Sequence, residues 1–333
     1  MPSTALAAKP RKLYWGAHIG DQLTGTAAPY DMGAVSKFAA IAGKGLSMVG
    51  VSAAFADCSS SPCTFYGFPT TLMEDVRQYG AIPFFTWASQ ATPPGGLSQP
   101  NFQLSDVISG KHDAYIRSFA AGAKSWGHPF FLRFNPEMNG NWFSWSERRN
   151  GNRRGESVAA WRHVHDIFTS VGATNATWVW CPNVNISDDS ALQHNLRALY
   201  PGRKYVDWTC LDGFNWGLRA GSPGWLSFKQ IFRRTYRRVI KIAPTKPMVL
   251  GEVASSDSGG SKAAWIRNML RTIPNKYRKI RGIIWNDVHD RDTNWPIETS
   301  RSATRAFRRG IGRRVYQPSR FANLAASPIR PPH

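Results

Sequence analysis

Long apolar runs, acidic side chains and cysteines are all scarce in this sequence. No stretch of about 18 consecutive apolar residues occurs, and a helix needs that length to span a bilayer. We therefore expect no membrane span. Apolar residues still make up 42% of the 333 residues, which is ordinary for a globular protein and leaves room for a large core.

Acidic residues number only 21 against 42 lysines and arginines, so the formal net charge is +21. Such an excess suggests an anionic partner, such as nucleic acid, a membrane surface or an acidic polymer, or else a solvated basic surface. The arginines fall in separate segments, at 147–154, 233–238 and 301–314. No zinc-finger, helix-turn-helix or RNA-binding signature accompanies them, so we expect no nucleic-acid partner and favour the solvated surface.

The four cysteines divide into two kinds. Cys58 and Cys63 close the short polar loop CSSSPC, which predicts a local disulfide and an oxidising compartment. Cys181 and Cys210 lie in apolar stretches, where buried free thiols are the usual state. None of the four has the spacing of zinc ligands, so we expect no metal and no cofactor.

Both ends of the chain have the composition of loose segments. Residues 1–12 contain ALAA, which is similar to the small-residue end of a cleaved signal peptide, although a disordered tail fits equally well. Residues 317–333 are basic and rich in Pro and Ala, and we expect a flexible tail. Residues 13–316 then form the folded unit, and export to the cell exterior is suggested.

Short apolar runs alternate with segments of helical period along this unit. The runs are nearly continuous rather than alternating, as in parallel strands buried on both faces. Helical patterns separate them, for example at 158–168, 228–242 and 262–274, the last ending at a proline. The eight runs are LYWGAHI (13–19), GLSMVGVSAA (45–54), AIPFFTWAS (81–89), PFFLRFNPE (129–137), ATWVWCPN (176–183), VDWTCLDGFNW (206–216), KPMVLGEVAS (246–255) and RGIIWNDV (281–288).

This order predicts an α/β fold consisting of a single (β/α)8 TIM barrel. A doubly wound open sheet is the rival architecture. The segment GAHIGDQLTG after the first run lacks the spacing of a phosphate-binding glycine fingerprint, so we favour the barrel.

Active sites of such barrels lie at the carboxyl ends of the strands. Glu137 ends the fourth run and Glu252 ends the seventh, each within an otherwise apolar strand. Amides and aromatic rings stand at the other ends: Asn135, Asn139, Asn183, Trp87, Phe214, Asn215, Trp216 and Trp285. Glycoside hydrolysis needs two carboxyl groups across the scissile bond, with aromatic platforms for the sugar rings. We expect the two glutamates to face each other at roughly 5–5.5 Å, the separation of retaining enzymes.

The same residues resemble glycoside hydrolase family 26. The acid/base motif of that family is similar to R-x-x-H-E-M-N-G-x-W-x-x-W, and the chain has RFNPEMNGNWFSW at 133–145. YPGRKYVDWTCLDGFNWG (200–217) and KPMVLGEVASS (246–256) resemble the strand-six and nucleophile segments of the family. The similarity extends over residues 13–310 and implies a retaining (β/α)8 barrel.

The resemblance implies a role for each matching residue. Glu137 would be the acid/base and Glu252 the nucleophile of a double displacement. Arg133 would balance charge below the glutamates, Trp142 would line the cleft beside the acid, and Trp285 would form the floor of the subsite that holds the attacked sugar. Further substrate contacts are expected from Asn139, Asn183 and Phe214.

Two positions depart from the pattern of the family. Pro136 stands where the family has His before the acid/base, which removes a hydrogen-bonding partner. Phe214 stands where the family has a Tyr that bonds the nucleophile, and the missing hydroxyl predicts a higher pKa for Glu252 and slower chemistry.

The resemblance makes β-1,4-mannan the first candidate substrate, ahead of mixed-linkage β-glucan and xylan. A carbohydrate-binding barrel with weak turnover is the alternative that Pro136 and Phe214 suggest. The arginine-rich segment SERRNGNRRGES (146–157) follows the acid/base directly and is interpreted as a solvated loop rather than a contact for an acidic glycan. We expect a monomer.

Overall fold

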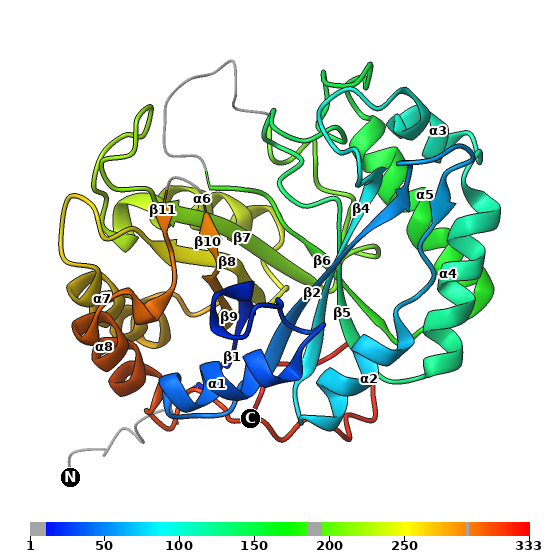
Figure 1. Cartoon of the computed structure of the whole chain (residues 1–333). Helices are drawn as coiled ribbons and strands as arrows, with labels where there is room; N and C mark the ends of the chain where they lie inside the picture. Colours follow the sequence, from blue (N-terminus) through cyan, green and yellow to red (C-terminus); the bar gives the residue numbers. More distant parts are fainter. Residues whose placement is uncertain (1–10, 185–194, 291–292) are drawn as a thin grey trace, which may run out of the picture.

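The computed structural model describes residues 11–184, 195–290 and 293–333 (Figure 1). Eight parallel strands form a closed barrel: β1 (Tyr14–Ile19), β2 (Met48–Asp57), β4 (Ile82–Ala91), β5 (Phe130–Phe134), β6 (Ala176–Trp180), β7 (Trp208–Asn215), β8 (Met248–Ser255) and β9 (Ile280–Asp287). β1 pairs with both β2 and β9, which closes the cylinder. The predicted (β/α)8 barrel is confirmed, and each strand overlaps one of the eight apolar runs.

Helices cover the outside of the barrel (Figure 1). They are α1 (Met32–Ala42), α2 (Thr70–Gln78), α3 (Leu104–Ile108), α4 (Asp113–Trp126), α5 (Glu156–Val171), α6 (Phe228–Ile242), α7 (Lys262–Lys276) and α8 (Arg301–Ile311). Ser side chains cap α6, α7 and α8 by accepting from a backbone N–H in the first turn. The described residues between β6 and β7 contain no α-helix.

Two small hairpin elements lie outside the barrel. β3 (Thr64–Phe65) pairs antiparallel with the end of β2, and β10 (His289–Asp290) pairs with β11 (Thr293–Asn294) just after β9. The predicted disulfide between Cys58 and Cys63 is present in the turn between β2 and β3.

Helix α7 continues past Pro274, where the sequence predicted its end. A proline at that position leaves the carbonyl of Leu270, four residues earlier, without its helical donor. The hydroxyl of Tyr316 donates to this carbonyl over 2.7 Å and Arg313 donates over 3.1 Å. These two bonds replace the missing one, which explains how the helix extends to Lys276.

The C-terminal segment differs from the flexible tail that its composition suggested. It runs along the amino-terminal end of the barrel, as the red trace shows in Figure 1. Ile329 is 2% exposed and packs into the lower interior of the barrel. Its N–H donates to Thr177 Oγ1 over 2.9 Å, and its carbonyl accepts from the indole of Trp208 over 2.7 Å. The segment closes the lower end of the barrel with apolar side chains. The N-terminal segment expected at 1–12 lies largely outside the described residues.

Candidate active site

Glu137 follows β5 in a strained turn at the carboxyl end of the barrel. Its φ is +55° and that of Asn135 is +41°, a left-handed conformation that is unfavourable for residues other than glycine. The N–H of Glu137 donates to Cys181 O over 2.6 Å, and the side chain of Asn135 accepts from Ser89 N and donates to Ser89 Oγ, each over 2.8 Å. These bonds to β4 and to the end of β6 hold the turn and aim the carboxylate into the barrel mouth.

Glu252 lies on β8 at a break in strand pairing. The register with β9 shifts between Leu250 and Val253, and an irregularity of this kind redirects the side chain. Gly251 permits the arrangement, since a Cβ atom there would lie 2.6 Å from Cys210 Sγ and 2.9 Å from Arg133 Nη1. The backbone therefore packs directly against the groups beneath the site.

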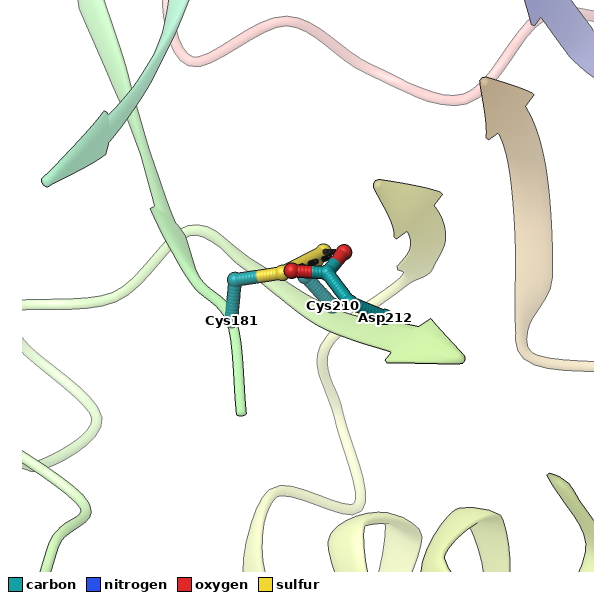
Figure 2. Close-up of side chains that lie close together, drawn as sticks. All are labelled: Cys181, Cys210 and Asp212. Atoms are coloured by element: carbon teal, nitrogen blue, oxygen red, sulfur yellow. Dashed lines mark hydrogen bonds between the residues drawn. A yellow bond between two sulfur atoms is a disulfide. The ribbon is translucent and has the colours of Figure 1, made fainter. Parts of the chain in front are cut away.

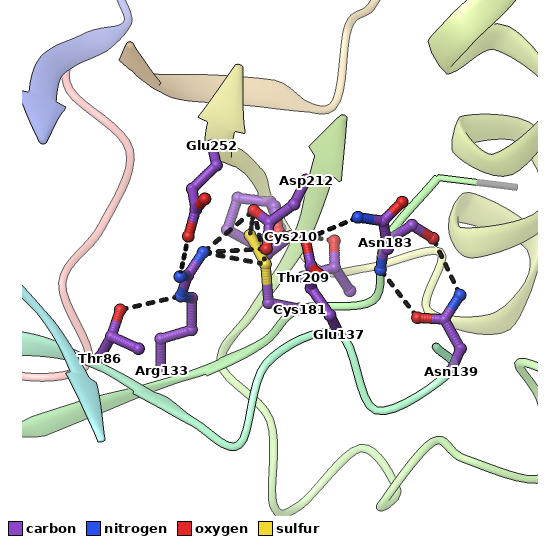
Figure 3. The surroundings of a disulfide bond; sticks show 11 residues. Thr86, Arg133, Glu137, Asn139, Cys181, Asn183, Thr209, Cys210, Asp212 and Glu252 are labelled. Carbon is purple, nitrogen blue, oxygen red and sulfur yellow. Dashed lines mark hydrogen bonds and ion pairs between the residues drawn. A yellow bond between two sulfur atoms is a disulfide. The ribbon is translucent and has the colours of Figure 1, made fainter. Parts of the chain in front are cut away.

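Arg133 connects the two sides of the site (Figure 3). It is 2% exposed; Nη2 donates to Glu252 Oε1 in a short charged hydrogen bond, and Nη1 lies 3.0 Å from both carboxylate oxygens of Asp212. Its Nε donates to Thr86 Oγ1 over 3.0 Å. A buried guanidinium between two carboxylates is thus compensated, and the orientation of Glu252 is set by a rigid donor.

Glu137 receives two hydrogen bonds on its two oxygens. Asn183 Nδ2 donates to Oε1 and Trp142 Nε1 donates to Oε2, each over 2.6 Å. Asn139 and Asn183 bond each other through side chain and backbone, over 2.8 and 3.0 Å (Figure 3). Asn139 therefore holds Asn183, whereas Asn183 and Trp142 hold the carboxylate.

The two glutamates have opposite pKa shifts. Burial, together with the negative charge of Glu252, raises the pKa of Glu137 to about 7, although Asn183 and Trp142 oppose the change. Burial acts in the same direction on Glu252 and is the largest single influence. The charge of Arg133, the nearby His18 and the hydrogen bond from Arg133 together outweigh it and lower the pKa of Glu252 below its usual value. Phe214 in place of Tyr therefore leaves this carboxylate ionised. One carboxyl can hold a proton near neutrality while the other stays ionised.

Two site residues were not singled out from the sequence. Asp212 is fully buried on β7, and burial raises its pKa well above the usual value even beside Arg133. His18 lies at the end of β1, where burial lowers the pKa of its imidazole to about 4. Its Nε2 has no hydrogen-bonding partner among the described residues. A charged residue within the apolar run at 206–216 was a usable signal for Asp212; the sequence around His18 offers no comparable one.

Cys181 and Cys210 form a disulfide at the base of the site, so the expectation of two free thiols is wrong. The residues come from neighbouring strands and both side chains point into the barrel, which brings them together despite 29 positions of separation. Figure 2 shows Asp212 beside them, with Oδ1 3.2 Å from Cys181 Sγ. Since both sulfurs are bonded to each other, neither is a thiolate that a metal ion could use.

A cleft of about 1180 Å³ opens above the two glutamates. Arg133, Trp142, Asn183 and Phe214 all line it, as expected for substrate contacts. Six further lining side chains are aromatic, which suits sugar rings. They are Tyr30, Tyr66, Phe143, Trp145, Trp216 and Trp295.

Trp285 does not lie in this cleft, so the prediction that it forms the floor of a subsite is wrong. It is fully buried and packs on Trp265 and Phe307 in the helical layer, while its neighbour Asn286 lines the cleft. Alternate residues of a strand face opposite sides, so a shift of one position reverses the assignment. Trp87 of β4 faces outward in the same way and stacks on Phe119, with ring centroids 4.1 Å apart.

Three other aromatic side chains that line the cleft form a cluster. Trp295, which follows β11, and Trp216, which follows β7, pack edge to face with centroids 4.9 Å apart. Phe214 contacts both rings, with centroids 5.4 Å from Trp216 and 5.1 Å from Trp295.

Comparison with known proteins places this site in a family context. Residues 113–257 match the family model described as glycosyl hydrolase family 26, and that range includes both glutamates. Endoglucanase H of Acetivibrio thermocellus is 35% identical over 262 residues, which are 76% of this chain and 27% of that protein. A mannan endo-1,4-beta-mannosidase of Bacillus subtilis is 25% identical over 169 residues, covering 47% and 44% of the two chains. The chain thus spans less than half the length of these two relatives.

Solved structures share the fold. A modular endo-beta-1,4-mannanase from Cellulomonas fimi superposes with a TM-score of 0.69 at 17% identity, covering 93% of this chain and 72% of that one. A mannanase of Bacillus subtilis superposes with a TM-score of 0.61 at 18% identity, covering 90% and 85%.

Proposed function

Because the chain belongs to glycosyl hydrolase family 26, we propose that it is a retaining endo-β-glycosidase that cleaves a β-1,4-linked polysaccharide by double displacement. The observation that supports this most strongly is the pair of carboxyl groups in one aromatic cleft. The pKa of Glu137 is raised to about 7 and that of Glu252 is lowered. A proton donor and a nucleophile are what glycosyl transfer to a carboxylate needs.

In the first step an oxygen of Glu252 bonds to the anomeric carbon while the bond from that carbon to the leaving sugar oxygen breaks. Glu137 gives its proton to that oxygen, so the leaving chain departs as a neutral alcohol. Arg133 holds Glu252 in place and keeps it ionised before attack. The products are a shortened polymer and a glycosyl ester on Glu252.

In the second step Glu137, now ionised, takes a proton from water as the water oxygen attacks the same carbon. The ester bond breaks, and Glu252 leaves as a carboxylate. Two displacements at one carbon retain its configuration. The hydrogen bonds from Asn183 and Trp142 to Glu137 stabilise the ionised form that acts as the base.

β-1,4-Mannan is the first substrate we propose, because one curated relative and several structural neighbours carry mannanase names. A β-glucan is the second candidate, because the relative at 35% identity is named an endoglucanase. Xylan ranks below both.

Product analysis on β-mannan, mixed-linkage β-glucan and xylan tests the proposal, with Glu137→Ala and Glu252→Ala as blanks. We expect oligosaccharides from one polymer and none from either blank. Full activity in Glu252→Ala would contradict the assignment of the nucleophile. Binding of oligosaccharides without product from any polymer would instead favour the weakly active binding barrel, and Phe214→Tyr would then be the variant to test for recovered turnover.

We also propose that the protein acts outside the cell. Two disulfides, one of them beneath the active site, require an oxidising environment to form and persist. Among the described residues, no helix has the length and hydropathy of a membrane span. The test is to separate the secreted and intracellular fractions of a producing cell without reductant. The fraction that contains the protein with both disulfides formed shows where it acts.

A further inference from the structure

Three neighbouring helices on the outside of the barrel carry many basic side chains and no acidic one. Their sequences are FKQIFRRTYRRVIKI for α6, KAAWIRNMLRTIPNK for α7 and RSATRAFRRGI for α8. The buried stripe of each helix packs on the barrel, so the arginines point to solvent. None of them lines the catalytic cleft. This basic face, defined by α6, α7 and α8, is a surface that the proposed reaction does not use.

A groove between α7 and α8 concentrates this charge. The two helices lie side by side in Figure 1, and the groove between them has a volume of about 500 Å³. Arg267 and Arg271 line it from α7, and Arg309 and Arg313 line it from α8 and the residues that follow. Gly310 brings the helices close, since a Cβ there would lie 2.3 Å from Leu270 Cδ1. Four guanidinium groups therefore flank a shallow groove.

No carboxylate neutralises these groups within the part of the chain that the structure describes. Every ion pair among the described residues involves other cations. Of the four arginines, Arg313 donates to the carbonyl of Leu270 over 3.1 Å, and the described residues provide no carboxylate partner for any of them. A second hollow of about 580 Å³ on α6 adds Arg233 and Arg237 to the same face. Charges left unpaired on one face create a positive potential that attracts polyanions.

We propose that the basic face binds an acidic polysaccharide, with its carboxylates paired to the arginines of the α7–α8 groove. Guanidinium groups suit this task because their fork of N–H donors matches a carboxylate. The large apolar side chains exposed in the described residues lie elsewhere, so the face has no ring to stack on bases and no wedge for a bilayer. They are Tyr30, Phe65, Tyr66, Leu97, Trp142 and Leu218.

The choice of a polysaccharide rests on the proposed function. An enzyme that cleaves a neutral glycan in a mixed matrix gains local substrate concentration when a separate face holds it on an acidic glycan of the same matrix. The cleft and the basic face then act on different polymers, and each can be tested without the other.

The test measures binding of the full chain to polygalacturonate by affinity electrophoresis, at low salt and at about 0.15 M salt, where charges on the surface are screened within about 8 Å. The variant is R267Q/R271Q/R309Q, which leaves Arg313 in place because it supports the carbonyl of Leu270. The matched control R148Q/R149Q/R154Q removes the same charge from exposed arginines of the 146–157 loop. Because exposed ion pairs each contribute little, the loss of three of them predicts a loss of affinity of about tenfold for the groove variant.

We expect the control to lose less than about twofold in affinity. The fully methyl-esterified polymer, which lacks charge, should bind none of the three proteins. Equal losses of affinity in both variants would mean that net charge alone is responsible, and would contradict the assignment of binding to the α7–α8 groove. Equal or tighter binding to duplex DNA or to phosphatidylserine vesicles would overturn the choice of an acidic polysaccharide. Hydrolysis of a soluble neutral oligosaccharide should be the same in all three proteins; its absence in all three would count against the proposed function and not against the basic face.

Discussion

The hydrogen bond from Trp142 to Glu137 tunes the acid/base, and its removal has a calculable effect. Trp142→Phe keeps an aromatic ring in the cleft but deletes the N–H that donates to Glu137 Oε2 over 2.6 Å. That bond stabilises the ionised carboxylate, so its loss raises the pKa of Glu137 from its value of about 7. A hydrogen bond to a charged group contributes about 1.5–3 kcal/mol. Trp142 is 45% exposed, so water weakens this bond and the lower end of that energy range applies.

One pKa unit corresponds to about 1.36 kcal/mol, so the alkaline limb should move up by about one pH unit. The assay is kcat/KM against pH on a soluble substrate. Glu137 must carry its proton to act as the acid, so activity falls as pH rises through its pKa. Trp145→Phe is the matched control, because its indole donates to Pro136 O over 2.7 Å and not to the carboxylate. An unmoved or lowered limb in Trp142→Phe, or an equal shift in the control, would refute the reasoning.

Three further predictions concern other parts of the site. Arg133→Met should destabilise the fold by about 3–5 kcal/mol in urea unfolding and abolish turnover, because it leaves the buried Asp212 and the half-buried Glu252 without their cation. Arg133→Lys should restore part of the stability. Glu137→Gln should stabilise the protein more at pH 8 than at pH 4.5, by up to about 3 kcal/mol. The pKa of Glu137 is about 7 in the folded protein and 4.5 ordinarily, so ionisation of this buried carboxyl opposes folding as the pH rises above 4.5. The effect is complete above pH 7 and absent below pH 4.5. Trp216→Ala should raise KM about tenfold with little change in stability, because its ring lines the cleft. Trp285→Ala should lower the free energy of unfolding by about 3–5 kcal/mol and leave KM of the folded protein unchanged, because its ring is fully buried. A change in KM for Trp285→Ala alone would contradict the placement of the two rings.

The barrel could be predicted because its strands are buried on both faces and therefore appear as continuous apolar runs. The same continuity hides which face each residue takes. Trp285 and Asn286 are adjacent, and only the register of β9 decides that Asn286 lines the cleft. Glu137 and Glu252 were identifiable since a carboxylate that ends an apolar strand is conspicuous, and their place at the barrel mouth follows from the fold.

Contacts between residues that are distant in the sequence could not be predicted from composition. The disulfide between Cys181 and Cys210 depends on the register of neighbouring strands, and nothing local in either run indicates it. The C-terminal segment is basic and rich in proline and alanine, yet Ile329 packs among the buried side chains of the lower barrel, a contact that depends on the whole fold. The pKa shifts of the glutamates likewise depend on Arg133 and on burial that no single segment contains.

The stereochemistry of the first product tests the central claim most directly. Early time points of hydrolysis, followed by proton NMR of the anomeric signals, distinguish one displacement from two. Nucleophilic attack by Glu252 followed by hydrolysis predicts that the β-anomer forms first and mutarotates later. Initial release of the α-anomer would contradict a glycosyl-enzyme on Glu252 and would assign the second carboxylate to activation of water.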